Sequence, residues 1–173
     1  MLSAVKSDEK FLNKSMDWNF PIPIAYGPGR LNEISAFCSK FKISNPLIVT
    51  DKGSKKLPFV TRLTTLLRNA SIQSQLFYGI SPNPRDDEIN AGCIAYSKGN
   101  HDGIIAIGGG SALDGAKAIG MTVNSGVDLW DFEYRKPEPI LNSSDCFPTF
   151  ITIPTTAGTG AETESPAMVT DTV

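Results

Sequence analysis

A short apolar run followed by three consecutive glycines is the feature that most constrains this sequence. The run at 103–107 is typical of a buried strand, and the glycines occupy 108–110. Ser111, a good N-cap residue, then begins a predicted helix at 111–121, with Asp114 near its start. A strand, a glycine turn and a helix N-terminus can bind phosphate together, because the glycine backbone approaches an anion closely and the first helical N–H groups point at it.

Two standard phosphate-binding motifs do not fit this stretch. A dinucleotide fingerprint G-x-G-x-x-G that starts at Gly108 requires glycine at 113, where the chain has Leu113. A P-loop that starts at Gly110 requires lysine at 116, where the chain has Ala116. The stretch therefore predicts an anion site of neither standard type. The alternative is a tight strand-to-helix turn that binds no ligand.

Predicted helices and buried strands alternate along most of the chain. After an edge strand or ribbon at 18–26, the spacing predicts strands at 46–51, 72–78, 103–107, 147–153 and 167–171. It predicts helices at 30–41, around 60–67, at 86–97 and at 111–121, with one helical turn at 128–131. This alternation implies βαβ units and an α/β fold, with a Rossmann-like parallel sheet and helices on both faces.

Composition narrows the class of protein. The chain has 173 residues, 40% of them hydrophobic and 20% charged, which is typical of a soluble globular domain. A net charge of -2 gives no electrostatic case for nucleic acid or an anionic membrane, and no apolar run is long enough to span a bilayer. Cys38, Cys93 and Cys146 lie far apart, so we expect free thiols in a reducing cytoplasm. His101 lies in a turn-like sequence, so we expect a solvated side chain and no metal centre within these residues.

Ligands of open α/β sheets bind outside the carboxyl ends of the strands, where four turns of this chain are predicted. These turns contain Asp51, Asn83, the glycines at 108–110 and the loop at 155–160. Asp51 favours NAD over NADP, because a carboxylate accepts hydrogen bonds from a ribose 2′-hydroxyl and repels a 2′-phosphate. A role as a helix N-cap or turn residue is the alternative. Because Asp51 precedes the glycine turn, the strand order must differ from that of a standard Rossmann unit.

A second polar, glycine-bearing loop follows the strand predicted at 147–153. The hydroxyls of Thr155, Thr156 and Thr159 suit a phosphate, a ribose or an adenine edge, and a plain β-turn is the alternative. Asp114 fits a phosphate site poorly, because a carboxylate beside a phosphate is unfavourable. A structural role, as a helix cap or in a pair with Lys117, therefore competes with direct contact to a ligand.

These turns resemble the iron-dependent (group III) alcohol dehydrogenase family. Gly-Gly-Gly-Ser-Ala-Leu-Asp-Gly-Ala-Lys is similar to the family pattern GGGSxxDxAK, and Pro-Thr-Thr-Ala-Gly-Thr-Gly-Ala-Glu is similar to PTTAGTGSE. Val-Thr-Asp at 49–51 and Pro-Asn-Pro at 82–84 match in the same order. Ala161 stands where the family usually has Ser. The resemblance covers about residues 18–173.

The resemblance implies a dehydroquinate synthase-like N-terminal domain that binds the dinucleotide. We expect a flexible tail at 1–15 and this domain at 16–173. The adenosine half would lie near Asp51 and Asn83, the pyrophosphate on the glycine turn and Ser111, and the rest of the cofactor along the threonine loop. The predicted cofactor-binding residues are Asp51, Asn83, Gly109, Gly110, Ser111, Asp114, Thr155, Thr156 and Thr159.

The family's metal ligands, one Asp and three His of a C-terminal helical domain, cannot be placed in this sequence. Because the chain ends on a predicted strand, we expect it to be truncated before that domain. We therefore predict the cofactor-binding part of an NAD(P)-dependent alcohol dehydrogenase. A divalent metal, iron in the type case, would be bound beyond this chain and would act as a Lewis acid on the alcohol or aldehyde oxygen. No catalytic or metal-binding residue is predicted within the chain, so we expect it to be inactive alone.

Two alternatives remain, a second kind of enzyme and a protein of another class. One is a dehydroquinate-synthase-like, NAD-dependent lyase, against which the Pro-Thr-Thr-Ala-Gly-Thr-Gly loop argues. The other is a non-catalytic nucleotide-binding module. The family resemblance also implies a homo-oligomer, although no residue of this sequence indicates an interface.

Overall fold

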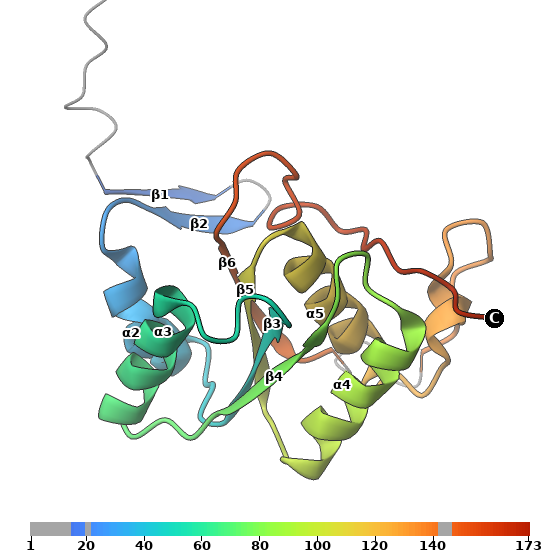
Figure 1. Ribbon diagram of the computed structural model, residues 1–173, viewed down its shortest axis with the longest axis horizontal. Coiled ribbons are helices and arrows are strands. Elements are labelled where there is room, and N and C mark those ends of the chain that lie inside the picture. Colours follow the sequence, from blue (N-terminus) through green and yellow to red (C-terminus); the bar gives the residue numbers. More distant parts are fainter. Residues whose placement is uncertain (1–14, 20–21, 142–146) are drawn as a thin grey trace, which may run out of the picture.

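The computed structural model describes residues 15–19, 22–141 and 147–173 (Figure 1). The predicted tail, apart from Ser15, and Cys146 therefore lie outside the described residues. The elements are β1 (Met16–Asn19), β2 (Pro23–Tyr26), η1 (Arg30–Glu33), α2 (Ile34–Lys40), β3 (Pro46–Asp51), α3 (Pro58–Asn69), β4 (Gln75–Ile80), α4 (Asp86–Lys98), β5 (Gly103–Gly108), α5 (Gly110–Thr122), η2 (Leu129–Phe132) and β6 (Thr149–Pro154). The strands β4, β3, β5 and β6, in that order, form one parallel sheet. This confirms the predicted α/β class.

Both faces of the sheet are covered by helices, as the sequence predicted (Figure 1). In β3, Leu47 and Val49 pack into the core beneath α4 and α5, whereas Ile48 packs beneath α2 and α3. Strand side chains alternate between faces, so a strand buried on both sides is apolar along most of its length. This explains the continuous apolar runs of β3 and β5, which form the centre of the sheet.

The order of the strands reverses at the centre of the sheet. The connection through α3 places β4 on one side of β3, whereas the chain after β5 places β6 on the other side. The carboxyl ends of β3 and β5, with Asp51 and Gly108, therefore meet at a topological switch point, where open α/β sheets bind ligands. Asp51 can thus precede the glycine turn in sequence and still lie beside it.

The strand predicted at 72–78 begins later, as β4 at Gln75. Ser71 adopts a left-handed conformation with φ 59°, and Ile72 donates its N–H to the carbonyl oxygen of Leu67 at 3.0 Å. Ile72 also packs against the core beneath α3. It therefore closes the end of that helix, in the manner of a left-handed C-terminal cap, and does not begin the strand.

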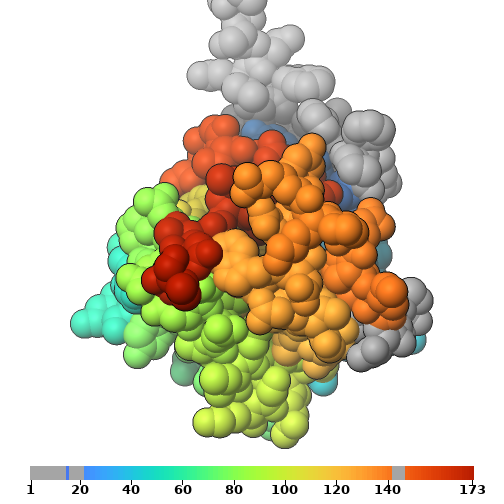
Figure 2. All heavy atoms as spheres, turned by 90° about the vertical axis from the view of Figure 1, so that its right-hand side faces the viewer, coloured from blue at the N-terminus to red at the C-terminus, as the bar shows by residue number. Residues whose placement is uncertain are grey.

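The strand predicted at 167–171 is wrong. Only Thr170 makes a bridge, to Arg85, with hydrogen bonds from Thr170 N–H to the Pro84 carbonyl (2.7 Å) and from Asp86 N–H to the Thr170 carbonyl (3.2 Å). The segment runs over the start of α4, and Figure 2 shows it between α4 and the segment around η2. Ala167 and Val169 pack against the core that includes residues of α4 and α5, whereas Met168 is exposed, so the apolar pattern arises here without strand pairing.

The predicted ribbon at 18–26 is confirmed as an antiparallel pair, β1 and β2, that is separate from the main sheet. The prediction for His101 is wrong: its side chain is buried, with Nδ1 2.8 Å from the Asn45 carbonyl oxygen and the ring beside Tyr96. The ring lies against Gly99, where the absence of a side chain leaves room for it. His101 lies before β5, at the end of the sheet opposite the glycine turn.

Candidate functional site

In the glycine turn, a single residue separates the end of β5 at Gly108 from the start of α5 at Gly110. Gly108 has φ 149°, and a Cβ there would lie 2.6 Å from the Cβ of Ala112, so only glycine permits this turn. Ser111 is not the N-cap that the sequence predicted. Gly109 occupies that position, no side chain caps the helix, and the first helical residue is Gly110. The first N–H groups of α5 therefore have no side-chain partner, as an anion site at a helix N-terminus requires.

The threonine loop packs directly on the glycine turn. Thr155 donates its N–H to the carbonyl at the end of β5 (2.9 Å). A Cβ on Gly109 would lie 3.3 Å from Thr156 Oγ1, and a Cβ on Gly110 would lie 2.9 Å from Thr159 Cγ2. The two glycines therefore allow the hydroxyl-bearing loop to approach the start of α5. Two turns that lie far apart in the sequence form one polar surface.

A groove of about 480 Å³ lies beside this surface. The predicted site residues that line it are Asn83, Gly110, Ser111, Asp114 and Thr159. The other predicted residues, Asp51, Gly109, Thr155 and Thr156, lie at the same end of the sheet but do not line the groove. The structure thus brings all the predicted turns to one edge, although it separates them into a groove and its neighbouring rim.

The two oxygens of Asp51 have different surroundings. Oδ1 accepts hydrogen bonds from the N–H groups of Gly53 and Ser54, both at 2.9 Å, as a turn residue would. Oδ2 faces the glycine turn, since a Cβ on Gly108 would lie 3.3 Å from it. Among the described residues, none donates a hydrogen bond to Oδ2. Asp51 therefore acts as a turn residue through Oδ1, while Oδ2 remains free to accept a hydrogen bond.

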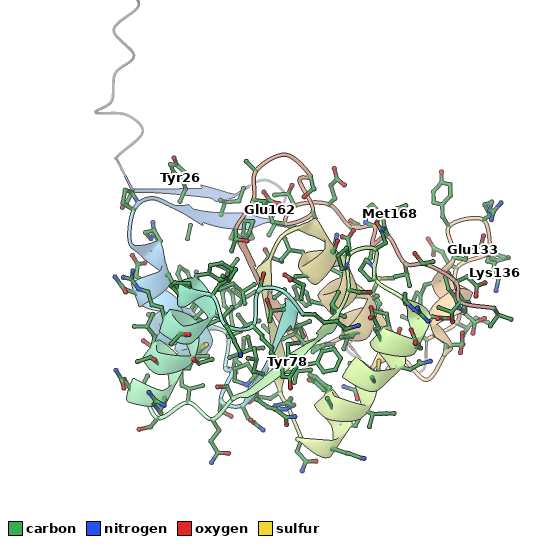
Figure 3. The ribbon with its side chains drawn as sticks, viewed as in Figure 1. Tyr26, Tyr78, Glu133, Lys136, Glu162 and Met168 are labelled. Carbon is green, nitrogen blue, oxygen red and sulfur yellow. The ribbon has the colours of Figure 1, made fainter. Side chains whose placement is uncertain are left out.

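Asp114 forms the predicted pair with Lys117, with 3.0 Å between Oδ1 and Nζ, and both side chains are largely buried. The ammonium group also donates to the carbonyl oxygens of Glu164 (3.1 Å) and Pro166 (2.5 Å), while Asp114 Oδ2 accepts the N–H of Met168 (3.3 Å). This pair fixes segment 161–170, the outer wall of the groove, where Figure 3 labels Met168. Sequence reasoning missed this wall. The i, i+3 spacing indicated the pair but not the carbonyl groups that it holds.

Sequence reasoning also missed the pair formed by Glu88 and Lys52, which contacts the loop that carries Asn83. Glu88 accepts hydrogen bonds from Lys52 Nζ (2.5 Å) and from Ser81, just before that loop. The only signal in the sequence was the acidic start of the predicted helix at 86–97, which the helix dipole alone would explain.

No group of three or more His, Cys, Asp and Glu side chains that could hold a metal ion occurs within the ranges that the structure describes. In the same ranges, no helix is long and apolar enough to cross a membrane. Cys38 and Cys93 are free thiols, as predicted. Burial raises the pKa of Cys93 to about 11, so its thiol is neutral at physiological pH.

A sequence model of iron-containing alcohol dehydrogenases matches residues 21–173. The chain belongs to this family. Choline dehydrogenase from Bacillus subtilis strain 168 is 34% identical over 160 residues, which are 92% of this chain and 39% of that protein. The chain therefore spans well under half the length of this relative.

Solved structures agree with this assignment. The crystal structure of a 1,3-propanediol oxidoreductase superposes with a TM-score of 0.72 at 30% identity, over 84% of this chain and 37% of that one. The sulfoacetaldehyde reductase of Bifidobacterium kashiwanohense, solved in complex with NAD+, superposes with a TM-score of 0.66 at 30% identity, over 79% of this chain and 35% of that one. The predicted family and fold are confirmed.

Proposed function

We propose that this chain binds NAD along the groove and its rim, as the cofactor-binding part of an NAD(P)-dependent alcohol dehydrogenase. The observation that carries the proposal is the three-glycine turn at the switch point, against which the threonine loop packs. The similar reductase was solved with NAD+, which supports the same ligand here. The family match favours a dehydrogenase over the dehydroquinate-synthase-like lyase.

The residues at the turn fit a dinucleotide. Side chains at Gly109 and Gly110 would fill the space between α5 and the threonine loop, and their absence leaves backbone N–H groups for the pyrophosphate. Ser111 would add its hydroxyl at the same turn. Asp51 Oδ2 would accept a hydrogen bond from the adenosine ribose, and Asn83 would line the same half of the cofactor.

When bound, NAD+ would accept a hydride from the alcohol carbon, which yields NADH and an aldehyde while the hydroxyl proton goes to solvent. This chain's own residues would bind and orient the cofactor for that transfer. The described residues contain no group of His, Cys, Asp and Glu side chains that could hold a metal ion, so the metal of the family would require ligands other than these.

The substrate class that we propose is a small alcohol or its aldehyde. Similar proteins are named for choline and for 1,3-propanediol, both of which are alcohols. Free thiols at Cys38 and Cys93 support a reducing, cytoplasmic location. Homo-oligomer formation stays a prediction that rests on the family resemblance.

Titration of the protein with NADH, followed by the change in nucleotide fluorescence, tests cofactor binding. Gly110→Ala would force Thr159 away from the turn, and we expect NADH affinity to fall about tenfold, or about 1.4 kcal/mol. Gly120→Ala is the matched control, because it lies in the same helix and its Cβ would make only ordinary contacts of 3.4 Å or more. Failure of the unaltered protein to bind NADH would refute the proposal, and so would equal affinities of the two variants.

A further inference from the structure

Glu88 is a buried carboxylate in the first turn of α4, and it does not line the groove. Its Oε1 accepts a hydrogen bond from Lys52 Nζ at 2.5 Å. Its Oε2 accepts hydrogen bonds from the N–H and Oγ of Ser81, at 3.0 and 2.8 Å, and from the N–H of Arg85 at 3.3 Å. Charged and backbone donors therefore surround both oxygens.

These donors come from the segments that carry two predicted site residues. Lys52 directly follows Asp51 at the end of β3, and its own N–H donates to the Ile80 carbonyl at the end of β4 (2.8 Å). Ser81 and Arg85 flank the turn that contains Asn83. A single carboxylate thus joins the ends of β3 and β4 to the start of α4.

The turn held in this way has an unusual conformation. Asn83 adopts φ 58°, in the left-handed region that few non-glycine residues enter, and its side chain borders the groove. Residues in such conformations persist when surrounding contacts fix them. The contacts that Glu88 makes on both sides of the turn provide that constraint.

Helix capping explains only part of this arrangement. The bond from Arg85 N–H is the reciprocal bond of a capping box, and Asp86 and Asp87 already supply negative charge to the first turn. The bonds to Ser81 and Lys52 contribute nothing to capping. Burial raises the pKa of Glu88, but hydrogen bonds from Lys52, Ser81 and Arg85 outweigh burial and lower the pKa below its ordinary value of 4.5. The side chain is therefore ionised at neutral pH.

We propose that Glu88 is a positioning residue of the cofactor site, which holds the Asn83 turn and the end of β3 in the geometry that binds the dinucleotide. The inference rests on the proposed function, because it assigns the purpose of this geometry to NAD. Glu88 touches no cofactor itself, and it acts through Ser81 and Lys52.

The test compares Glu88→Gln with Asp87→Asn. Asp87 is the matched control, since it is an exposed carboxylate in the same helical turn, and its bonds to the Arg85 side chain and to the Glu88 N–H do not reach Ser81 or Lys52. We expect Glu88→Gln to weaken NADH binding about tenfold, or about 1.4 kcal/mol, and Asp87→Asn to leave it unchanged. Amide hydrogen exchange at Ser81 and Arg85 should accelerate in Glu88→Gln alone.

Two further variants separate positioning from general destabilisation. Ile34→Val shortens a core side chain on the face of the sheet that α2 and α3 cover, away from α4. It should therefore lower the melting temperature without changing NADH affinity.

The double variant Lys52→Met, Glu88→Gln tests whether the two side chains act as one unit. It should weaken NADH binding no more than the stronger of the two single changes. Additive losses of affinity would overturn that coupling.

The outcomes distinguish this inference from the proposed function. If the unaltered protein binds no NADH, the proposed function fails and the purpose assigned to Glu88 fails with it. If the unaltered protein binds NADH and Glu88→Gln binds it equally well, the proposed function stands and the positioning role is overturned. Faster exchange at Ser81 together with weaker NADH binding supports the inference.

Discussion

Asp51 combines two roles within one carboxylate, because Oδ1 fixes its own turn and Oδ2 remains available beside the glycines. Under the proposed function, we expect this free oxygen to accept a hydrogen bond from a ribose hydroxyl and to repel a phosphate. Neutralising the charge while keeping the shape should therefore change the choice of nucleotide more than the fold. Asn suits this test, since its side-chain oxygen can still accept the bonds from Gly53 and Ser54.

We predict that Asp51→Asn narrows the preference for NADH over NADPH by about tenfold, or about 1.4 kcal/mol. The measurement is the ratio of the two dissociation constants, taken at low and high salt, because a charge effect weakens as salt rises. Glu138→Gln removes an exposed carboxylate that does not line the groove and serves as the control. An unchanged ratio in Asp51→Asn would remove the charge of Asp51 from the explanation of nucleotide choice.

At the scale of elements, the outer wall of the groove has no regular structure of its own. Segment 161–170 is held by Lys117, which donates to two of its carbonyl oxygens, and by Asp114, which accepts one of its N–H groups. Lys117 is only 12% exposed, so these bonds are little screened by solvent. Lys117 is therefore one of the contacts that hold the wall, together with the backbone bonds that join Thr170 to Pro84 and Asp86.

We predict that Lys117→Met lowers the free energy of unfolding by about 2 kcal/mol, because it removes charged hydrogen bonds and leaves Asp114 without its cation. Urea unfolding measures the loss, and limited proteolysis should cut segment 161–170 sooner. Lys98→Met, at the exposed end of α4, is the control and should change neither result. If the wall resists proteolysis in Lys117→Met, its position does not depend on this lysine.

The contrast between strands and wall shows which elements the sequence could predict. β3 and β5 are recognisable because burial on both faces requires an unbroken apolar run. Segment 167–171 also begins with an apolar run, but Ala167 and Val169 are only partly buried against the core that includes α4 and α5, and the backbone pairs only at Thr170. The burial of His101 is not predictable from the sequence for a related reason. The space that Gly99 leaves for its ring exists only in the folded turn. Tertiary contacts of this kind leave no periodic signal.

Across the whole molecule, the two ends of the parallel sheet differ in the contacts that they make. The carboxyl end carries the turns of the candidate site. At the amino end, Asp102, which precedes β5, binds the segment that precedes β3. Asp102 accepts hydrogen bonds from the N–H and Oγ of Ser44, at 2.7 and 2.6 Å, and from the N–H of Asn45 at 2.9 Å. We therefore expect a change at Asp102 to alter stability without altering the candidate site.

The pH dependence of Asp102 gives the last prediction. Burial raises its pKa, but the bonds from Ser44 and Asn45 outweigh burial and lower the pKa below its ordinary value of 3.8. Because the folded-state pKa is the lower one, this carboxylate stabilises the fold above pH 3.8 and loses that effect as the pH falls through the folded-state pKa. We predict that Asp102→Asn costs about 1 kcal/mol at pH 7, a modest value because the residue is exposed. Urea unfolding at pH 7 and at acid pH should show the difference from the unaltered protein shrinking as the pH falls, while NADH affinity at pH 7 stays constant. A difference in stability that grew on acidification would contradict this account of Asp102, and a loss of NADH affinity would show that the two ends of the sheet are coupled.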